Sequence, residues 1–209
     1  EATYGGKDNI MPHRQETDEE LMKVIKDTTE KGGKVLIPTL GVGRAQEVML
    51  AIEAMVREGR MQSIPVYIDG MVWDVTAIHT AYPEYLNNNV RKLIFHKDQN
   101  PFMHEIFKRV GSQEERKQVI EETCPCVIVA TSGMLTGGPS VQYLKHLCDN
   151  PRNSMGFVNY QGDVSMGRRI QLGEREFTFS DGGKPEVLQI KMQVHTVDGF
   201  SGHSSRNQL

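Results

Sequence analysis

The sequence predicts an α/β fold in which a mainly parallel central sheet is flanked by helices on both faces. Strand patterns and helix patterns alternate along the chain, as they do when βαβ units follow one another. Residues 126–131 are apolar almost throughout, which is typical of a central strand covered on both faces. Right-handed crossovers then place helices on each side of the sheet. The 209 residues are enough for one such domain, and we assign residues 1–209 to it.

The first half of the chain predicts a helix followed by two strand–helix units. Thr17 and Glu20 have capping-box spacing ahead of apolar residues at helical spacing, and Gly32-Gly33 ends that helix. The elements expected after it are a strand at 34–38, a glycine turn at 39–44, a helix from Arg44, a strand at 65–69 and a helix at 73–82 that Pro83 closes.

The second half begins with a stretch of mixed helix and loop at 84–110, in which Phe95, Phe102, Ile106 and Phe107 are interpreted as core residues. Ser112 and Glu115 form a capping box that opens a helix to about residue 123. After the apolar strand we expect a loop at 132–138, a helix at 139–148, strands at 156–159 and 176–180 around a short helix or turn at 167–172, and one final alternating strand at 187–194.

Composition and charge exclude several classes of protein. With 38% hydrophobic and 24% charged residues, the chain has the composition of a soluble globular domain. No run of the sequence is apolar for the length that a membrane span needs, and no secretory signal is present, so we expect a cytoplasmic protein without a membrane partner. A formal charge of −3 argues against binding to nucleic acid through a bulk positive field, so any RNA contact should be local.

The cysteines and histidines do not have the spacing of a metal site. Cys124, Cys126 and Cys148 are interpreted as reduced, buried thiols, because no second ligand pair accompanies Cys124-Pro-Cys126 at zinc spacing. No two of the seven histidines have His-x-His or His-x3-His spacing. We therefore expect this chain to hold no catalytic metal or other cofactor by itself.

Three glycine-bearing loops, 39–44, 131–138 and 160–169, fall where strands end, and in parallel sheets ligands bind at that edge. One hypothesis is that backbone N–H groups around Gly133, together with Ser132 and Arg44 or Arg168, hold the phosphates of a polymer. The alternative is that the glycines only close tight turns. A dinucleotide site is disfavoured, because Gln46 replaces the third glycine of the fingerprint and only Asp69 could serve as the ribose ligand.

The end of the sequence is expected to place a histidine at the edge of the sheet. The alternating run 187–194 leads into Gly199-Phe-Ser-Gly-His203, where small residues allow a sharp turn. The simpler interpretation is a strand-to-helix turn whose histidine caps or packs locally. Because residue 1 is Glu1 and a helix start is cut off at residue 209, the sequence reads as a segment of a larger protein.

Four stretches together resemble the β-CASP family of metallo-β-lactamase nucleases, and most closely archaeal relatives of the cleavage and polyadenylation specificity factor endonuclease. They are Glu1-x-Thr3-Tyr4-Gly5, Thr131-Ser-Gly-Met134, Gly167-Arg-Arg-Ile170 and Phe200-Ser-Gly-His203, in family order over the whole chain. The resemblance implies a Rossmann-like β-CASP domain inserted in a metallo-β-lactamase domain, with RNA entering the cleft between the two.

The resemblance also implies roles for the two ends of the chain. Glu1 matches the family's motif A carboxylate and His203 its motif B histidine; the two are expected to hydrogen-bond beside a zinc pair, with the histidine contacting the scissile phosphate and protonating the leaving oxygen. The family's zinc-binding motifs have no match here, so the zinc pair is expected in the full-length parent and not in this chain.

The expected function is therefore the RNA-clamping part of a zinc-dependent ribonuclease, a hydrolase of RNA 3′-end processing or decay, that is inactive alone. Its expected partners are RNA and the metallo-β-lactamase domain of the same polypeptide. The sequence does not decide whether the parent forms a homodimer, or whether it acts as an endonuclease or an exonuclease. Two alternatives remain: a non-catalytic RNA-binding or assembly module from a pseudo-nuclease, and an unrelated Rossmann-type cofactor domain.

Overall fold

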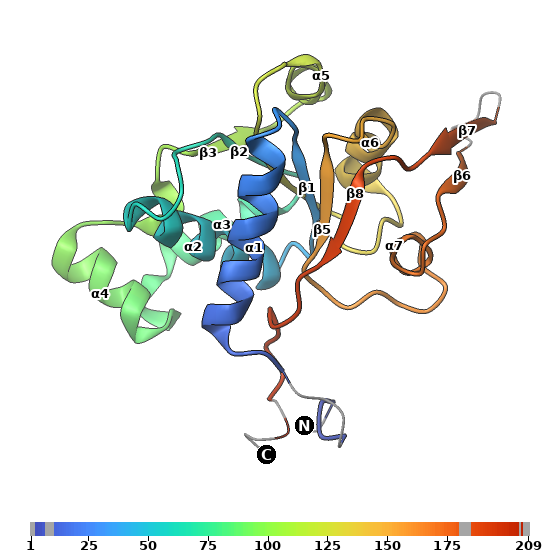
Figure 1. The fold of residues 1–209 in the computed structure, drawn as a ribbon. Helices are drawn as coiled ribbons and strands as arrows, with labels where there is room; N and C mark the ends of the chain where they lie inside the picture. The colour runs from blue at the N-terminus through green and yellow to red at the C-terminus, as the bar shows by residue number, and fades with distance from the viewer. Residues whose placement is uncertain (1–2, 7–10, 180–184, 205, 207–209) are drawn as a thin grey trace.

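The computed structural model describes residues 3–6, 11–179, 185–204 and 206. Its centre is a six-stranded sheet in the order β3-β2-β4-β1-β5-β8, in which every neighbouring pair is parallel (Figure 1). The strands are β1 (Val35–Pro38), β2 (Val66–Asp69), β3 (Phe107–Val110), β4 (Val127–Ala130), β5 (Ser154–Phe157) and β8 (Gln193–Thr196). The predicted α/β fold class is confirmed.

Helices cover both faces of the sheet and define two separate hydrophobic cores. One core lies under α1 (Arg14–Thr29), α2 (Arg44–Arg57), α3 (Val72–Ala81) and α4 (Asn88–Lys97), with the 3₁₀ turns η1 (Pro83–Tyr85) and η2 (Pro101–Met103) beside α4. The other lies under α5 (Gln113–Glu121), α6 (Gly138–Leu147) and α7 (Met166–Gln171). In β4, Val127 and Val129 face the first core while Ile128 faces the second, which explains why this strand is apolar without alternation.

The strands end in register, so the loops that follow them meet at one edge of the sheet. Ala130 at the end of β4 pairs with Pro38 of β1 on one side and with Asp69 of β2 on the other. On the far side of β1, Phe157 of β5 pairs with Thr196 of β8. This carboxyl edge is where the sequence places its glycine loops and His203.

The segment 84–110 differs from its predicted mixture of helix and loop, because its last residues form the edge strand β3. Lys108 and Arg109 are exposed there, so the strand lacks an apolar signature. Phe102 and Phe107 are buried as predicted, but Phe95 is 58% exposed, and its assignment to the core is wrong.

The final alternating run forms two strands where one was predicted. β7 (Glu186–Gln189) pairs antiparallel with β6 (Glu176–Phe179) in a separate hairpin, and β8 returns to the main sheet. Between β7 and β8 the backbone N–H groups donate to carbonyl groups outside either sheet pairing. Ile190 N donates to Arg175 O at 2.7 Å, and Met192 N donates to Cys148 O at 2.9 Å. These long-range hydrogen bonds interrupt the predicted strand 187–194. β5 also ends at Phe157, two residues before the predicted end of that strand.

The first helix begins three residues earlier than its predicted cap. His13 is the N-cap residue, and its N–H donates to the Glu16 carboxylate at 3.1 Å, so Thr17 lies inside the helix. Thr17 is buried and its hydroxyl donates to the Asp198 carbonyl oxygen at 2.8 Å. The predicted cap is thus a link between α1 and the loop after β8. The capping role of Ser112 is confirmed, since its hydroxyl accepts from Glu115 N at 3.1 Å.

Candidate functional site

Residues from the two ends of the chain meet at the carboxyl edge of the sheet. The rings of Tyr4 and His203 pack edge to face with 5.7 Å between their centroids, and Arg206 Nη1 donates to Gly5 O at 2.8 Å. In Figure 1 both segments lie together beyond the first turn of α1. Glu1 lies outside the described residues, so its hydrogen bond to His203 stays a prediction.

The turn that carries His203 is fixed from beneath by α1. Gly199 has a φ of +106°, and a Cβ there would overlap the Thr17 hydroxyl that holds Asp198 O, so only glycine fits. Phe200 is buried, and the Arg14 guanidinium lies 4.7 Å from its ring centroid. These contacts anchor the turn to the body of the domain.

Arg44, the first residue of α2, lies beside the same turn. Its Nη1 is 2.7 Å from Glu47 Oε2, and its Nη2 would lie 3.6 Å from a Cβ placed on Gly202. Glu47 is also 4.0 Å from Arg14 Nη1, so one carboxylate joins the two arginines. The structure therefore brings Arg44 to the His203 turn. Its predicted phosphate contact stays a prediction.

Ser132 and Gly133 brace the loop between β4 and α6. The Ser132 hydroxyl accepts from Thr136 N at 2.9 Å and donates to Gly137 O at 3.1 Å, so it could donate to a phosphate only by giving up the bond to Gly137. The Gly133 carbonyl accepts from Gln161 Nε2 at 2.8 Å, which ties this loop to the loop after β5. A phosphate contact for either residue remains a prediction.

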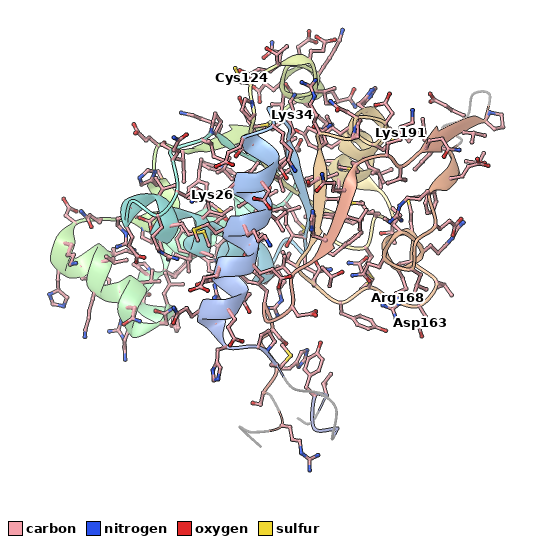
Figure 2. The ribbon with its side chains drawn as sticks, viewed as in Figure 1. Lys26, Lys34, Cys124, Asp163, Arg168 and Lys191 are labelled. Atoms are coloured by element: carbon pink, nitrogen blue, oxygen red, sulfur yellow. The ribbon has the colours of Figure 1, made fainter. Side chains whose placement is uncertain are left out.

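Arg168 lies in a groove of about 420 Å³ at the ends of β5 and β8. Its backbone N donates to Ser165 Oγ at 3.1 Å, and its guanidinium approaches only Gln171 Oε1, at 3.5 Å. Across the described ranges of the chain it has no carboxylate within ion-pair distance. Figure 2 shows Arg168 and Asp163 on the same side of the molecule, from α7 and the loop that precedes it. This guanidinium is therefore available to an anion.

The sequence did not predict the acidic members of the groove. Asp163 comes from the loop after β5 and Asp198 from the loop after β8, and both line the groove with Arg168. In the part of the chain that the structure describes, neither carboxylate accepts a hydrogen bond or pairs with a cation. The pairing of β5 with β8 brings these loops together, and no local sequence motif marks that pairing.

Asp69, which the sequence offered as a ribose ligand, belongs to a buried hydrogen-bond network. It is 1% exposed, and Arg116 donates to both of its oxygens at 2.8 and 2.9 Å while the Tyr143 hydroxyl donates at 2.9 Å. Burial, and then the nearby Asp69 charge, raises the pKa of Tyr143, and the hydrogen bond to Asp69 raises the pKa of Arg116. With its acceptors occupied, Asp69 is not available to a dinucleotide.

The remaining candidates for redox or metal chemistry lie apart from this edge. Cys126 and Cys148 are buried, and burial raises the pKa of Cys126 to about 12, whereas Cys124 is exposed, contrary to expectation. Within the described residues, no three His, Cys, Asp or Glu side chains lie close enough to hold a metal ion. None of the helices described is both long and apolar enough to cross a membrane.

Comparison with known proteins agrees with the resemblance found in the sequence. The model of the Beta-Casp domain matches residues 45–170, and that of the Zn-dependent metallo-hydrolase RNA specificity domain matches residues 187–209. Proteins named transcription termination factor FttA are 54% identical in Methanocaldococcus jannaschii, 49% in Thermococcus kodakarensis and 48% in Lokiarchaeum sp., over 210 aligned positions. All of this chain is covered in each, and it spans 33%, 32% and 33% of those proteins respectively.

The match to the first model covers more than half of the chain and runs from the start of α2 almost to the end of α7. Its span includes Ser132, Gly133 and Arg168, while the second match includes the β8 strand and the His203 turn. The parallel sheet, with helices on both faces, agrees with this assignment. The chain belongs to the Beta-Casp (β-CASP) domain family.

Proposed function

We propose that this chain is a single β-CASP domain of a longer zinc-dependent ribonuclease, and that it clamps RNA for phosphodiester hydrolysis in 3′-end processing or decay. The family assignment supports this proposal, as do the match to a Zn-dependent metallo-hydrolase RNA specificity domain and the one-third share of the relatives' length that the chain spans. The remaining two-thirds is proposed to include a metallo-β-lactamase domain that packs against the carboxyl edge.

One observation carries the proposal: the Tyr4 end of the chain and the His203 turn meet at the edge where the Arg168 guanidinium has no carboxylate partner among the described residues. RNA binding needs local positive charge here because the chain as a whole is slightly acidic. His203 lies at the same edge, so it would share one surface with a phosphate held by Arg168. The site thus combines an anion ligand with a group that can transfer a proton.

In the proposed site, the Glu1 carboxylate accepts a hydrogen bond from the His203 imidazole, and His203 donates a proton to the leaving oxygen of the cleaved strand. Arg168 pairs with a phosphate of the RNA, and Arg44, which lies beside the turn, is a second proposed phosphate ligand. The described residues do not fit a zinc pair, so its ligands are proposed to belong to the rest of the longer protein. The isolated chain should consequently bind RNA without cleaving it.

The proposed function implies two partners and a location in the cell. RNA and the metallo-β-lactamase domain of the same polypeptide are direct partners, and a cytoplasmic location fits a protein that acts on transcripts. A second candidate is a non-catalytic RNA-binding module, which is favoured by the relatives' printed names, because these describe termination factors and not nucleases.

The proposal is tested by zinc-dependent RNA cleavage in the longer protein. His203→Ala should lower the cleavage rate by roughly 10²- to 10⁴-fold, as expected for loss of a proton donor. His146→Ala, on the exposed face of α6, is the control and should cleave normally. Undiminished cleavage by His203→Ala would remove the catalytic role. RNA binding by a wild-type protein that never cleaves would favour the second candidate.

A further inference from the structure

The groove at the ends of β5 and β8 contains charges of both signs that do not neutralise each other. Arg168 has no carboxylate partner, and the carboxylates of Asp163 and Asp198 have no donor, within the described part of the chain. Charged side chains that line a groove and have no partner in the protein can bind a ligand that carries the complementary groups. The ligand must therefore offer an anion to the arginine and hydrogen-bond donors to an aspartate.

A ribonucleotide unit of an RNA strand has this combination. Its phosphate is an anion that a guanidinium binds with directed hydrogen bonds, and its 2′-hydroxyl is a donor beside that phosphate. A polyphosphate fits less well, because two carboxylates in the groove would repel additional negative charge. The volume of about 420 Å³ lies within the range of small-ligand sites.

Of the two aspartates, Asp198 has the better-fixed backbone. Its carbonyl oxygen accepts from the buried Thr17 hydroxyl at 2.8 Å, and Gly199, the next residue, packs directly against Thr17. Asp163 lies instead on the loop between β5 and α7. A preorganised acceptor loses less entropy on binding, so Asp198 is the stronger ligand for a hydroxyl.

We propose that this groove holds one ribonucleotide of the RNA strand, with Arg168 on its phosphate and Asp198 accepting the hydrogen bond of its 2′-hydroxyl. Asp198 is then a specificity residue that favours RNA over DNA. This inference rests on the proposed function, since it takes RNA as the substrate class, and it adds the group that distinguishes RNA from DNA.

The test compares the longer protein's affinity for an RNA oligonucleotide and for DNA of the same sequence at one salt concentration. Removing a carboxylate strengthens the binding of any polyanion, so the ratio of the two affinities is the informative quantity. Asp198→Ala should lower the preference for RNA by about tenfold, the scale of one hydrogen bond to a charged group. Asp198→Asn keeps an acceptor and should give an intermediate ratio. Asp149→Ala, an exposed residue after α6, should leave the ratio unchanged.

A second measurement begins with the wild-type protein, so its first result does not depend on how a variant folds. Single 2′-deoxy substitutions along the RNA should reveal one position at which wild-type binding falls by about tenfold, and Asp198→Ala should abolish that position's effect. An RNA-to-DNA ratio unchanged by Asp198→Ala, with Arg168→Ala weakening both ligands, would overturn this inference and leave the proposed function intact. A wild-type protein that binds no RNA would instead defeat the proposed function itself.

Discussion

The imidazole of His203 packs against the ring of Tyr4 at an interplanar angle of 62°, although the two residues are 199 positions apart in the chain. The same edge holds Arg206 against the carbonyl of Gly5. Both contacts join residues that precede α1 to residues that follow β8. The two family motifs at the ends of the sequence therefore belong to one surface, which is the basis of the functional proposal.

The Tyr4 ring should contribute to holding His203 in place. Tyr4→Ala removes the contact and should lower RNA cleavage by the longer protein by roughly 2- to 10-fold, the equivalent of an aromatic pair worth about 0.5–1.5 kcal/mol. Tyr4→Phe retains the ring and should cleave at nearly the wild-type rate. Equal rates in the alanine and phenylalanine variants would show that the ring contact has no part in catalysis.

The glycine before Phe200 should be indispensable to the turn. Gly199→Ala adds a Cβ that collides with the Thr17 hydroxyl at a left-handed φ, so it should cost well over ~1 kcal/mol of unfolding free energy. Gly173→Ala is the matched control, because Gly173 also has a positive φ, +99°, but open space around its Cβ position. Urea unfolding measures both. If Gly199→Ala lowers the free energy of unfolding no more than Gly173→Ala does, the contact with Thr17 does not explain the need for glycine.

The buried Arg116–Asp69 pair should contribute far more to stability than the exposed pair that begins at the next residue of α5. Arg116→Met leaves the Asp69 carboxylate buried with only Tyr143 and a backbone donor, and should destabilise the fold by about 3–5 kcal/mol. Lys117→Ala removes an exposed ion pair to Glu121 and should cost about 0–1 kcal/mol. Similar losses of unfolding free energy for the two variants would refute this ranking.

His195 should make the fold less stable in mild acid. Burial against α1 lowers the pKa of His195 below its ordinary 6.5, with the Asp27 charge opposing this in part. The unfolded chain then binds a proton more readily than the folded one, so stability is full above about pH 6.5 and declines as pH falls through the folded-state pKa. His195→Gln should flatten this dependence in unfolding measured between pH 5 and 8, roughly the histidine range. His146→Gln should leave the pH dependence unchanged. If His195→Gln also leaves it unchanged, the pH dependence of stability comes from another group.

The sequence predicts the elements whose residues carry their own signal. The β4 strand is predictable because both of its faces are apolar, and the helix after Ser112 because its cap is local. β3 was not predictable, since Lys108 and Arg109 are exposed on an edge strand, and the break between β7 and β8 depends on bonds to distant backbone. Local patterns cannot encode either feature.

The site divides in the same way. The motif ending in His203 and the glycine loop at Gly133 could be placed at the carboxyl edge because they follow predicted strands. The groove could not, because Asp198 becomes a neighbour of Arg168 and Asp163 only through the parallel pairing of β5 with β8. The hydrogen bond from Thr17 to Asp198 and the position of Arg44 beside the His203 turn likewise depend on helix packing that no local pattern shows.

The most direct test of the central proposal, that Glu1 and His203 act as one unit, is a double-mutant cycle on zinc-dependent RNA cleavage by the longer protein. Glu1→Gln, His203→Ala and the double variant are compared with the wild type. If the two side chains share one proton-transfer role, each single change should lower the rate markedly, and the double variant should be no slower than the slower single variant. Rate losses that multiply in the double variant would show that the two residues act independently and would contradict the proposal.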